Sequence, residues 1–285
     1  MRRWLLLSVL TGFLAVLSVT DPAAAVNAAY LSGFQAANGP VADYVISTYN
    51  DIFWVCLGVY VLVQGLILYC VVAFRRTAKR PVEAAKQFSH NTTMELLWTA
   101  IPIIICIFIG YKAYAGLIFM RTVPQDAMAV DVIAYQFGWN FEYPEQGTIA
   151  PNPTKPYAPL SQNGTDRYVK TLVVPVDKDI VLNITSKDVI HAVFVPALGI
   201  KTDAIPGRIN YAWFRATKTG TFLGQCAELC GASHGEMFFK VQVLPLKEWQ
   251  QWIDKQRAAD GKAPLFRTAE VKVDRQAVQV SAVQE

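Results

Sequence analysis

Two long apolar runs dominate the first half of the chain. The first covers about residues 52–74 and has no charged residue, and the second covers about residues 96–120 and contains Lys112 near its far end. Each run exceeds the roughly 20 residues that an α-helix needs to cross a hydrocarbon layer. A buried helix of a soluble protein would also be apolar. Two such runs flanking a short, strongly cationic loop instead predict a transmembrane hairpin.

After residue 121 the pattern changes to short segments rich in β-branched and aromatic residues, bounded by Pro, Gly and Asp. This spacing predicts an all-β sandwich or barrel. Residues 145–166 are rich in Pro, Asn and Gly and are expected to form a surface loop, and residues 246–257 a short amphipathic helix. The expected strands are 128–137, 168–174, 179–185, 189–195, 209–215, 220–225 and 237–243.

The N-terminus has the pattern of a secretory signal peptide at residues 1–25. Arg2 and Arg3 precede a mostly apolar stretch, and the small residues at 23–25 offer a cleavage site. The alternative is an amphipathic or membrane helix that is not cleaved. The expected organisation is a signal peptide (1–25), a transmembrane hairpin (26–120), an outer β domain (121–257) and a C-terminal tail (258–285).

Composition and charge agree with a membrane protein. Hydrophobic residues make up 53% of the chain and charged residues 17%, which excludes a disordered chain. The net charge of +4 lies entirely in segment 75–86, where five Lys and Arg face one Glu, and five minus one is four. This is a topology signal rather than a nucleic-acid surface. By the positive-inside rule the segment is cytoplasmic, and the β domain lies on the other side.

A local cluster of metal-ligating residues lies in the β domain, in the segment GQCAELCGASHGEMFF. Cys226, Cys230, His234 and Met237 give the spacing C-x3-C-x3-H-x2-M. A disulfide is one alternative in an oxidising compartment, and a zinc site is another, although methionine is a poor zinc ligand. Thiolate, imidazole and thioether together favour copper. The other cysteines lie in the apolar runs and are expected to be packing residues: Cys56, Cys70 and Cys106.

Two thiolates can bridge two copper ions, and such a site needs a second imidazole. The chain has three histidines. His90 lies shortly before the second apolar run, on the expected cytoplasmic side, whereas His191, in KDVIHAVFVP, lies in an expected strand of the outer domain. His191 is therefore the remaining candidate.

The segments DVIHAVFVPALGIKTDAIPGRIN and GQCAELCGASHGEMFF closely resemble subunit II of the haem–copper cytochrome c oxidases, and the resemblance covers roughly residues 40–255. It implies a cupredoxin-like domain with a dinuclear copper A centre. That centre accepts electrons from cytochrome c and passes them to haem in subunit I, where dioxygen is reduced to water and protons are pumped. The implied copper ligands are His191, Cys226, Cys230, His234, Met237 and the backbone carbonyl of Glu228.

The resemblance also implies roles outside the copper ligands. The Glu228 carboxylate is expected to bind a magnesium ion shared with subunit I. Where the family typically has Gln-Trp-Tyr-Trp, this chain has Phe137 and Trp139 after Gln136, and both aromatic residues are expected to serve electron input. Glu95, in NTTMELLWTAIP, resembles the mouth of a proton-uptake channel, the plain alternative being a charge that marks the helix end.

The implied partners are oxidase subunits I and III, cytochrome c or a similar donor, and membrane lipid, with no nucleic acid. The implied location is the bacterial inner membrane, crossed by more than one helix, with the copper domain in the periplasm. A different class of function is a membrane-anchored copper carrier or metallochaperone. Such a protein would need exchangeable, exposed ligands, and it would not need a two-helix hairpin or Glu95.

Overall fold

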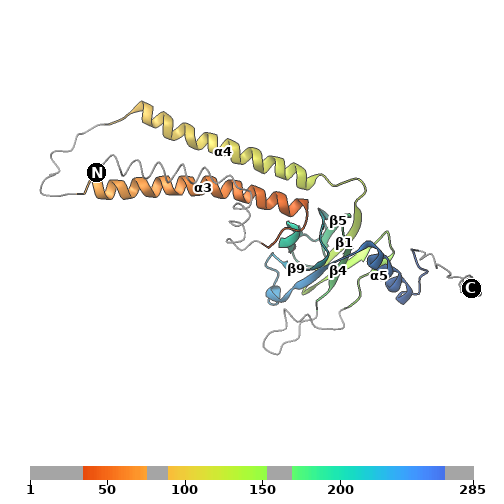
Figure 1. The fold of residues 1–285 in the computed structure, drawn as a ribbon. Helices are drawn as coiled ribbons and strands as arrows, with labels where there is room; N and C mark the ends of the chain where they lie inside the picture. Colours follow the sequence, from red (N-terminus) through yellow and green to blue (C-terminus); the bar gives the residue numbers. More distant parts are fainter. Residues whose placement is uncertain (1–34, 76–88, 153–168, 267–285) are drawn as a thin grey trace, which may run out of the picture.

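A pair of long helices joined to a β-sandwich makes up the described part of the chain (Figure 1). The computed structural model describes residues 35–75, 89–152 and 169–266. The expected signal peptide lies outside these residues, as do most of the cationic loop, much of the 145–166 loop and most of the C-terminal tail. The two helices run side by side away from the domain.

Both helices are long and apolar enough to cross a membrane. Helix α3 (Pro40–Ala73) contains the first apolar run except for its last residue, and helix α4 (Thr92–Arg121) contains all of the second. Their most apolar stretches are almost entirely exposed in the isolated chain. Apolar side chains in such numbers require lipid or another apolar surface around them, so the predicted transmembrane hairpin is confirmed.

The one basic residue inside the second apolar run has a counter-ion on the neighbouring helix. Lys112 Nζ lies 2.8 Å from a carboxylate oxygen of Asp51, which directly precedes the first apolar run. The hydroxyl of Tyr44 donates to the carbonyl of Lys112 over 3.1 Å. A Cβ at Gly116 would lie 2.6 Å from the Tyr44 ring, so this glycine lets the helices approach closely where the charge is paired.

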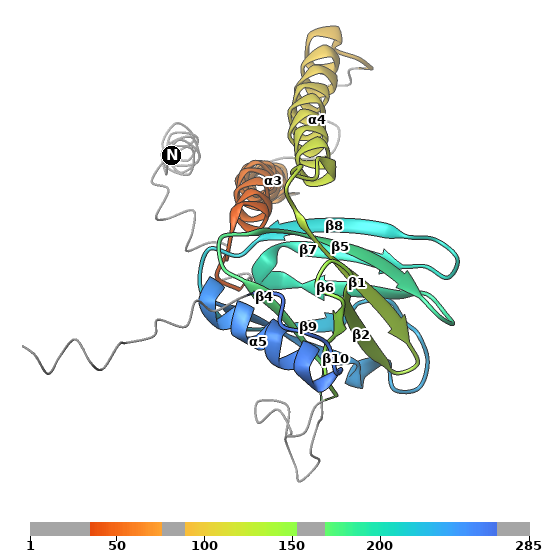
Figure 2. The same ribbon diagram turned by 90° about the vertical axis from the view of Figure 1, so that its right-hand side faces the viewer.

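The β domain consists of two five-stranded sheets (Figure 2). One has the order β3-β2-β1-β5-β8 and the other β4-β10-β9-β6-β7. β1 pairs with β5, and β4 with β10, in parallel, and the remaining pairs are antiparallel. The strands are β1 (Met128–Tyr135), β2 (Gly138–Tyr143), β3 (Thr148–Ile149), β4 (Thr171–Pro175), β5 (Asp179–Ser186), β6 (His191–Val195), β7 (Ile200–Ala204), β8 (Asn210–Arg215), β9 (Gly220–Cys226) and β10 (Phe238–Leu244).

The core lies between the two sheets and follows from the alternation of residues along the strands. In β1 and β5 every second residue is buried, as expected for strands with one face on a core. The Tyr143 hydroxyl joins the sheets, because it accepts from the N–H of Val173 (2.8 Å) and donates to the carbonyl of the same residue (3.1 Å). Burial raises the pKa of Tyr143, so this hydroxyl stays protonated. Helix α5 (Leu246–Ala259) packs against β3 and β4.

All seven expected strands are present, and the described residues contain three further strands that the sequence pattern did not predict. The expected helix at 246–257 is α5. Strand β2 alternates apolar and polar residues, but it was interpreted only as an aromatic segment. Strand β3 consists of two residues inside the expected loop 145–166, so the prediction of a loop is wrong at these two residues. Strand β7 is an edge strand with exposed polar residues, so its hydrophobic pattern is weak. The first expected strand ends at Tyr135 rather than at residue 137.

Asn38 and Gly39 attach the start of α3 to the β-sandwich. Asn38 is buried, and its side-chain oxygen accepts from the backbone N–H groups of Thr217 (2.9 Å) and Lys218 (2.8 Å). Gly39 has φ +121°, and a Cβ there would lie 1.8 Å from the carbonyl oxygen of Arg215. The start of α3 is therefore fixed to the end of β8 by contacts that leave no room for a side chain.

The end of α4 is attached to the same strand. The indole N–H of Trp213 donates to the carbonyl of Phe119 over 3.3 Å, and the two rings are 5.4 Å apart in an edge-on arrangement. Since both helices contact β8, the membrane anchor and the outer domain are connected by packing as well as by the chain. The domain is thereby held at a set position above the helices.

Replacing Gly199 with alanine is expected to destabilise this junction. Gly199 has φ +70°, and an added Cβ would lie 2.6 Å from the Cα of Ala42 in α3. The matched control is Gly207→Ala, because Gly207 has φ +73° with nothing within 4 Å of the added atom. The backbone conformation alone costs alanine about 1–2 kcal/mol. In thermal unfolding, Gly199→Ala should lower stability clearly more than Gly207→Ala. Equal losses would mean that α3 does not press on Gly199.

Candidate metal centre

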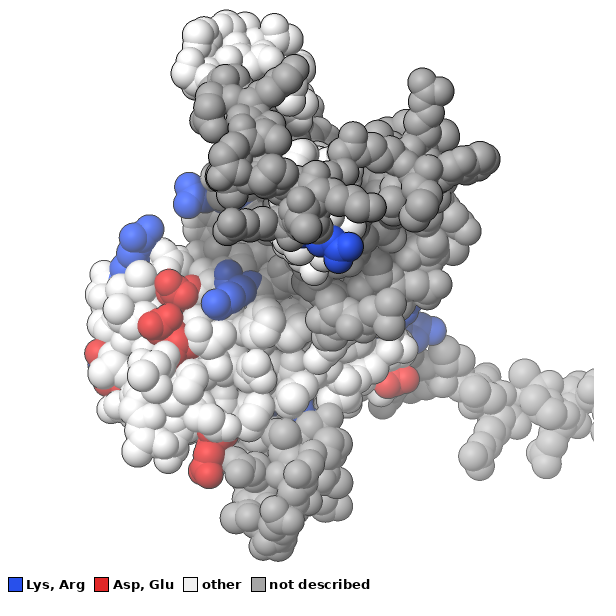
Figure 3. Space-filling view, turned by 90° about the vertical axis from the view of Figure 1, so that its left-hand side faces the viewer, with Lys and Arg blue, Asp and Glu red and all other residues white. Residues whose placement is uncertain are grey.

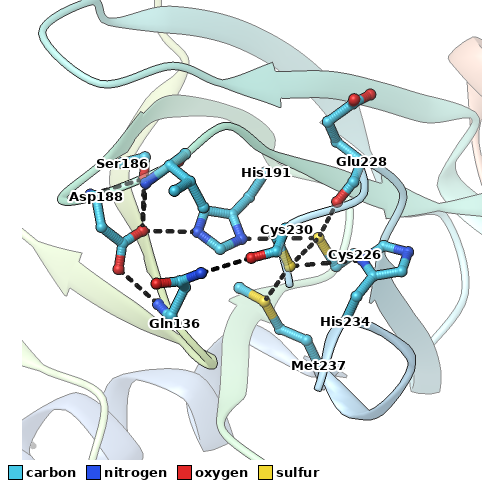
Figure 4. A network of polar contacts seen from close by, with 10 residues as sticks. Gln136, Ser186, Asp188, His191, Cys226, Glu228, Cys230, His234 and Met237 are labelled. Carbon is cyan, nitrogen blue, oxygen red and sulfur yellow. Dashed lines mark hydrogen bonds and ion pairs between the residues drawn. The ribbon is translucent and has the colours of Figure 1, made fainter. Parts of the chain in front are cut away.

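Five potential ligand side chains meet at one end of the β-sandwich (Figure 4). Cys226 ends β9, Cys230 lies in the following loop, and His234 begins the short 3-10 helix η4 (His234–Glu236). Met237 directly precedes β10, and His191 is the first residue of β6. Strand β6 pairs with β9. This pairing brings His191 next to Cys226 although 35 residues separate them in sequence.

The ligand atoms lie close enough together to share metal ions. The Sγ atoms of Cys226 and Cys230 are 4.0 Å apart. His191 Nδ1 lies 3.9 Å from Cys226 Sγ, and the carbonyl oxygen of Glu228 lies 3.4 Å from the same sulfur. On the other side, Cys230 Sγ lies 3.5 Å from His234 Nδ1 and 3.9 Å from Met237 Sδ. Each thiol therefore faces one imidazole and the other thiol.

The donor atoms suit a thiophilic metal. The two cysteines are free thiols at about twice the S–S distance of a disulfide. His191 and the two cysteines form a group of buried ligands whose atoms lie within 4.8 Å of one another. The carboxylate of Glu228 is exposed and points away from the sulfurs, while its carbonyl faces them (Figure 4). Two sulfurs, imidazole and thioether without an inward carboxylate select copper over harder cations.

Asp188 determines which nitrogen of His191 is available to a metal. His191 Nε2 lies 2.9 Å from a carboxylate oxygen of Asp188. The ring therefore donates Nε2–H to Asp188 and leaves the lone pair of Nδ1 facing Cys226. Burial raises the pKa of Asp188, but hydrogen bonds from His191 and from the N–H groups of Gln136 and Val189 outweigh it and bring the pKa to about 2. Asp188 is thus an anion at neutral pH.

The Cys230 thiol is protonated until a metal displaces the proton. Burial, together with the neighbouring Cys226, raises the pKa of the Cys230 thiol to about 11. A thiol ligates metals as the thiolate, so metal binding to Cys230 releases a proton. Burial therefore disfavours a thiolate at Cys230 whose negative charge is not compensated by a bound metal ion.

The two aromatic residues expected to serve electron input occupy different environments. Trp139 is 1% exposed, its ring lies 6.3 Å from that of His191, and its N–H donates to the carbonyl of Met237 over 3.3 Å. Phe137 is 40% exposed. A Cβ at Gly231 would lie 3.0 Å from the Phe137 ring, so the ring packs against the residue that follows Cys230. Phe137 lies at the surface, and Trp139 supports the ligands from the core.

Glu95 is not part of this cluster, because it lies near the start of α4, at the far end of the hairpin (Figure 1). Its carboxylate accepts from the N–H of Asn91 over 3.1 Å, and the Asn91 side chain accepts from the N–H of Met94 over 3.2 Å. This reciprocal pair caps the helix. Glu95 thus has a structural role at the helix end. His90 lies at the same end and does not reach the cluster.

Asp188 and Gln136 support the ligands, although no sequence motif marks either residue. In the sequence Gln136 is only the residue before the aromatic pair Phe137 and Trp139. The signal for Asp188 is its position three residues before His191, which suits a carboxylate that turns back onto the imidazole. No local signal could reveal Gln136, because its partners are far away in the sequence.

Two family models match the chain. They are described as "Cytochrome C oxidase subunit II, periplasmic domain", matching residues 128–244, and "Cytochrome C oxidase subunit II, transmembrane domain", matching residues 27–115. Together they cover both the helix pair and the β-sandwich. All five clustered side chains lie within the first match.

Individual relatives agree with the family models. Cytochrome c oxidase subunit 2 of Cereibacter sphaeroides is 33% identical over 246 residues, which are 79% of this chain and 80% of the relative. The probable cytochrome c oxidase subunit 2 of Rickettsia bellii is 31% identical, over 81% of this chain and 86% of the relative. The crystal structure of the periplasmic domain of subunit II of the Bradyrhizobium japonicum cytochrome oxidase is 35% identical. It matches 48% of this chain and 99% of that one, with a TM-score of 0.44.

Proposed function

The chain belongs to the cytochrome c oxidase subunit II family, and from this premise we propose that it is the electron-accepting subunit of a respiratory oxidase. It takes electrons from cytochrome c at a dinuclear copper A centre and delivers them to haem in subunit I, which reduces dioxygen to water and pumps protons. The observation that carries the proposal is the meeting of two free thiols with His191, His234 and Met237 in a domain held above two spanning helices.

Each ligand has a definite place in this proposal. Cys226 and Cys230 would bridge the two copper ions, while the side chains on either side of them would complete the coordination. Copper bridged by two thiolates supplies one-electron chemistry in which the electron is shared between both ions. The protein's part is to keep the ligand positions constant. The outer ligands are His191, His234, Met237 and the carbonyl of Glu228.

The surroundings of the ligands fit this task. Trp139 and Phe239 pack ring against ring beneath the site at 5.2 Å and exclude water. Asp188 holds the His191 ring in one orientation. The ligands of a centre that is buried and held in this way move little when the centre gains or loses an electron. Fast electron transfer needs this small change in geometry. The same burial argues against a copper carrier, because His191 is completely buried and a carrier needs accessible ligands.

We also propose the topology and the domain limits that follow from the sequence. Residues 1–25 are a cleaved signal peptide, 26–120 form the hairpin, 121–257 are the periplasmic copper domain and 258–285 a tail. The cationic segment 75–86 is then cytoplasmic, in the inner membrane of a bacterium. Residues 1–34 and 76–88 lie outside the described part of the chain, so the support is the charge pattern and the two apolar helices.

Subunit I is proposed to cover the face of the domain beside the helices. Figure 3 shows that the visible part of this face is largely uncharged, with charged residues mainly toward one edge. Leu229 is 78% exposed although it lies between two residues of the site, as expected for an apolar side chain that a partner covers. The neighbouring carboxylate of Glu228 is exposed and is proposed to bind a magnesium ion shared with subunit I. Subunit III would complete the complex.

A further hollow lies on the helix side of the domain, between the end of α4 and strands β7 and β8. It has a volume of about 620 Å³, and its lining combines apolar residues such as Leu117 and Ile209 with the charged Arg121, Asp203 and Arg208. Ile209 is strongly exposed. We include this hollow in the surface that subunit I covers, because it joins the membrane anchor to the domain.

Reduction of the purified oxidase by cytochrome c tests the proposed function. In stopped-flow measurements the copper spectrum should bleach before the haem spectrum changes, and higher salt should slow the bimolecular phase if opposed charges steer docking. If the protein instead transferred its copper to an acceptor protein and was not reduced by cytochrome c, the metallochaperone function would be favoured.

Phe137→Leu is expected to slow this reduction about tenfold, the equivalent of ~1.4 kcal/mol. Phe137 is the exposed aromatic side chain that packs against Gly231, next to Cys230. The copper spectrum should not change, because Phe137 is not among the ligands. An unchanged rate would exclude Phe137 from electron input.

A further inference from the structure

A continuous chain of hydrogen bonds connects His191 to Cys230 from outside the ligand cluster (Figure 4). His191 Nε2 donates to one carboxylate oxygen of Asp188 over 2.9 Å. The backbone N–H of Gln136 donates to the other carboxylate oxygen over 2.7 Å. The side-chain Nε2 of Gln136 donates to the backbone carbonyl of Cys230 over 2.6 Å.

These hydrogen bonds join the start of β6 to the loop after β9, and few strand-pairing bonds hold these two segments together. His191 begins β6, whereas Cys230 lies in the loop between β9 and β10. The ladder between β6 and β9 has two paired positions, Val193 with Cys226 and Phe194 with Gln225. One further backbone bond runs from Ala227 to Ala192, over 3.1 Å. Within the described part of the chain, no other pairing between these strands fixes the distance from His191 to Cys230.

Gln136 is placed to supply that missing constraint. It lies in the turn between β1 and β2, so it belongs to the opposite sheet from both ligands. Gly231 has φ +131°, and a Cβ on it would lie 3.0 Å from the Gln136 amide nitrogen. The absence of a side chain at Gly231 therefore lets the amide reach the Cys230 carbonyl. Although Gln136 is exposed, Cys230 itself is buried.

We propose that Gln136 is a positioning residue that braces Cys230 against His191 through Asp188. The proposal rests on the proposed copper function, because it concerns how the ligands of that centre are held. The two bonds of Gln136 act in different ways. Its backbone N–H holds Asp188 whatever its side chain is, and its side-chain amide holds the loop that carries Cys230. Losing the amide lets this loop move relative to His191, so the two halves of the copper site become unequal.

The test uses Gln136→Met in the purified full-length chain loaded with copper. Methionine has nearly the same length, cannot donate to the Cys230 carbonyl and keeps the backbone N–H for Asp188. Copper release to a chelator should become about three- to tenfold faster. The hyperfine pattern of the EPR spectrum should become less symmetric, and the midpoint potential should shift. A residue that contributes only to fold stability would not change the last two.

Two further variants keep the result interpretable. Gln242→Met is the matched control, because Gln242 is an exposed residue of β10, and it should behave as the parent. Gln136→Glu keeps the shape but replaces the donor with a carboxylate that repels the Cys230 carbonyl, and it should speed copper release at least as much as Gln136→Met. If both Gln136 variants match the parent in copper release, EPR spectrum and midpoint potential, Gln136 does not position Cys230 relative to His191. Failure of the proposed function is distinguishable, because the parent itself would then lack a two-copper spectrum.

Discussion

Replacing either Cys226 or Cys230 with serine is expected to abolish the two-copper centre. Cys226 faces His191 and the Glu228 carbonyl, and Cys230 faces His234 and Met237. Since the two sulfurs also face each other, each thiolate is needed by both metal positions. A serine hydroxyl is a hard donor that stays protonated at neutral pH, so it cannot replace a bridging thiolate.

The loss should exceed the roughly 10- to 100-fold reduction in metal affinity that is typical when a supporting residue is removed. Copper per chain and the visible spectrum of the purified protein measure it. Cys106→Ser is the matched control, because Cys106 is an exposed free thiol in α4. A serine variant that retained two coppers and the parent spectrum would show that the thiols do not bridge.

Glu95→Gln is expected to slow turnover of the assembled oxidase by about tenfold or more, while leaving its copper content unchanged. The carboxylate of Glu95 caps α4 by accepting from the N–H of Asn91. Glutamine keeps a carbonyl oxygen for this bond, but it cannot take up and release protons. The substitution therefore separates the proposed proton uptake from the structural role of the same side chain.

The matched control for Glu95→Gln is Asn91→Ala. It removes the cap on the N–H of Met94 and costs about 1 kcal/mol of helix stability, but it leaves the carboxylate in place. Stability should fall in this variant, whereas haem reduction should not slow. If Glu95→Gln matched the parent in turnover and in haem reduction, Glu95 would be a helix cap only.

The sequence predicts the architecture well where the physical signal is local. Two apolar runs are sufficient for the hairpin, because membrane thickness sets the length of a spanning helix. The ligands Cys226, Cys230, His234 and Met237 are adjacent in one segment, so their spacing reveals them. His191 can be inferred from the sequence only because the charge pattern predicts that His90 lies on the other side of the membrane. Its closeness to Cys226 depends on the pairing of β6 with β9, which no local pattern shows.

The parts that could not be predicted depend on contacts between distant segments. Asp188 and Gln136 act through partners on other loops. The burial of Trp139 beside Phe239 follows from the alternation along β2, and its expected role in electron input stays a prediction. Strand β7 was missed because an edge strand does not need apolar residues on both faces. The fold is thus clear from the sequence, while the support of the site is visible only in three dimensions.

The EPR spectrum of the purified full-length chain, reconstituted with copper and partly reduced, tests the central claim most directly. The measurement should be combined with the copper content per chain. One unpaired electron shared equally by two copper nuclei gives seven hyperfine lines, and we predict this pattern with two coppers bound. A four-line spectrum with one copper per chain, or a chain that binds no copper, would contradict a dinuclear centre held by Cys226 and Cys230.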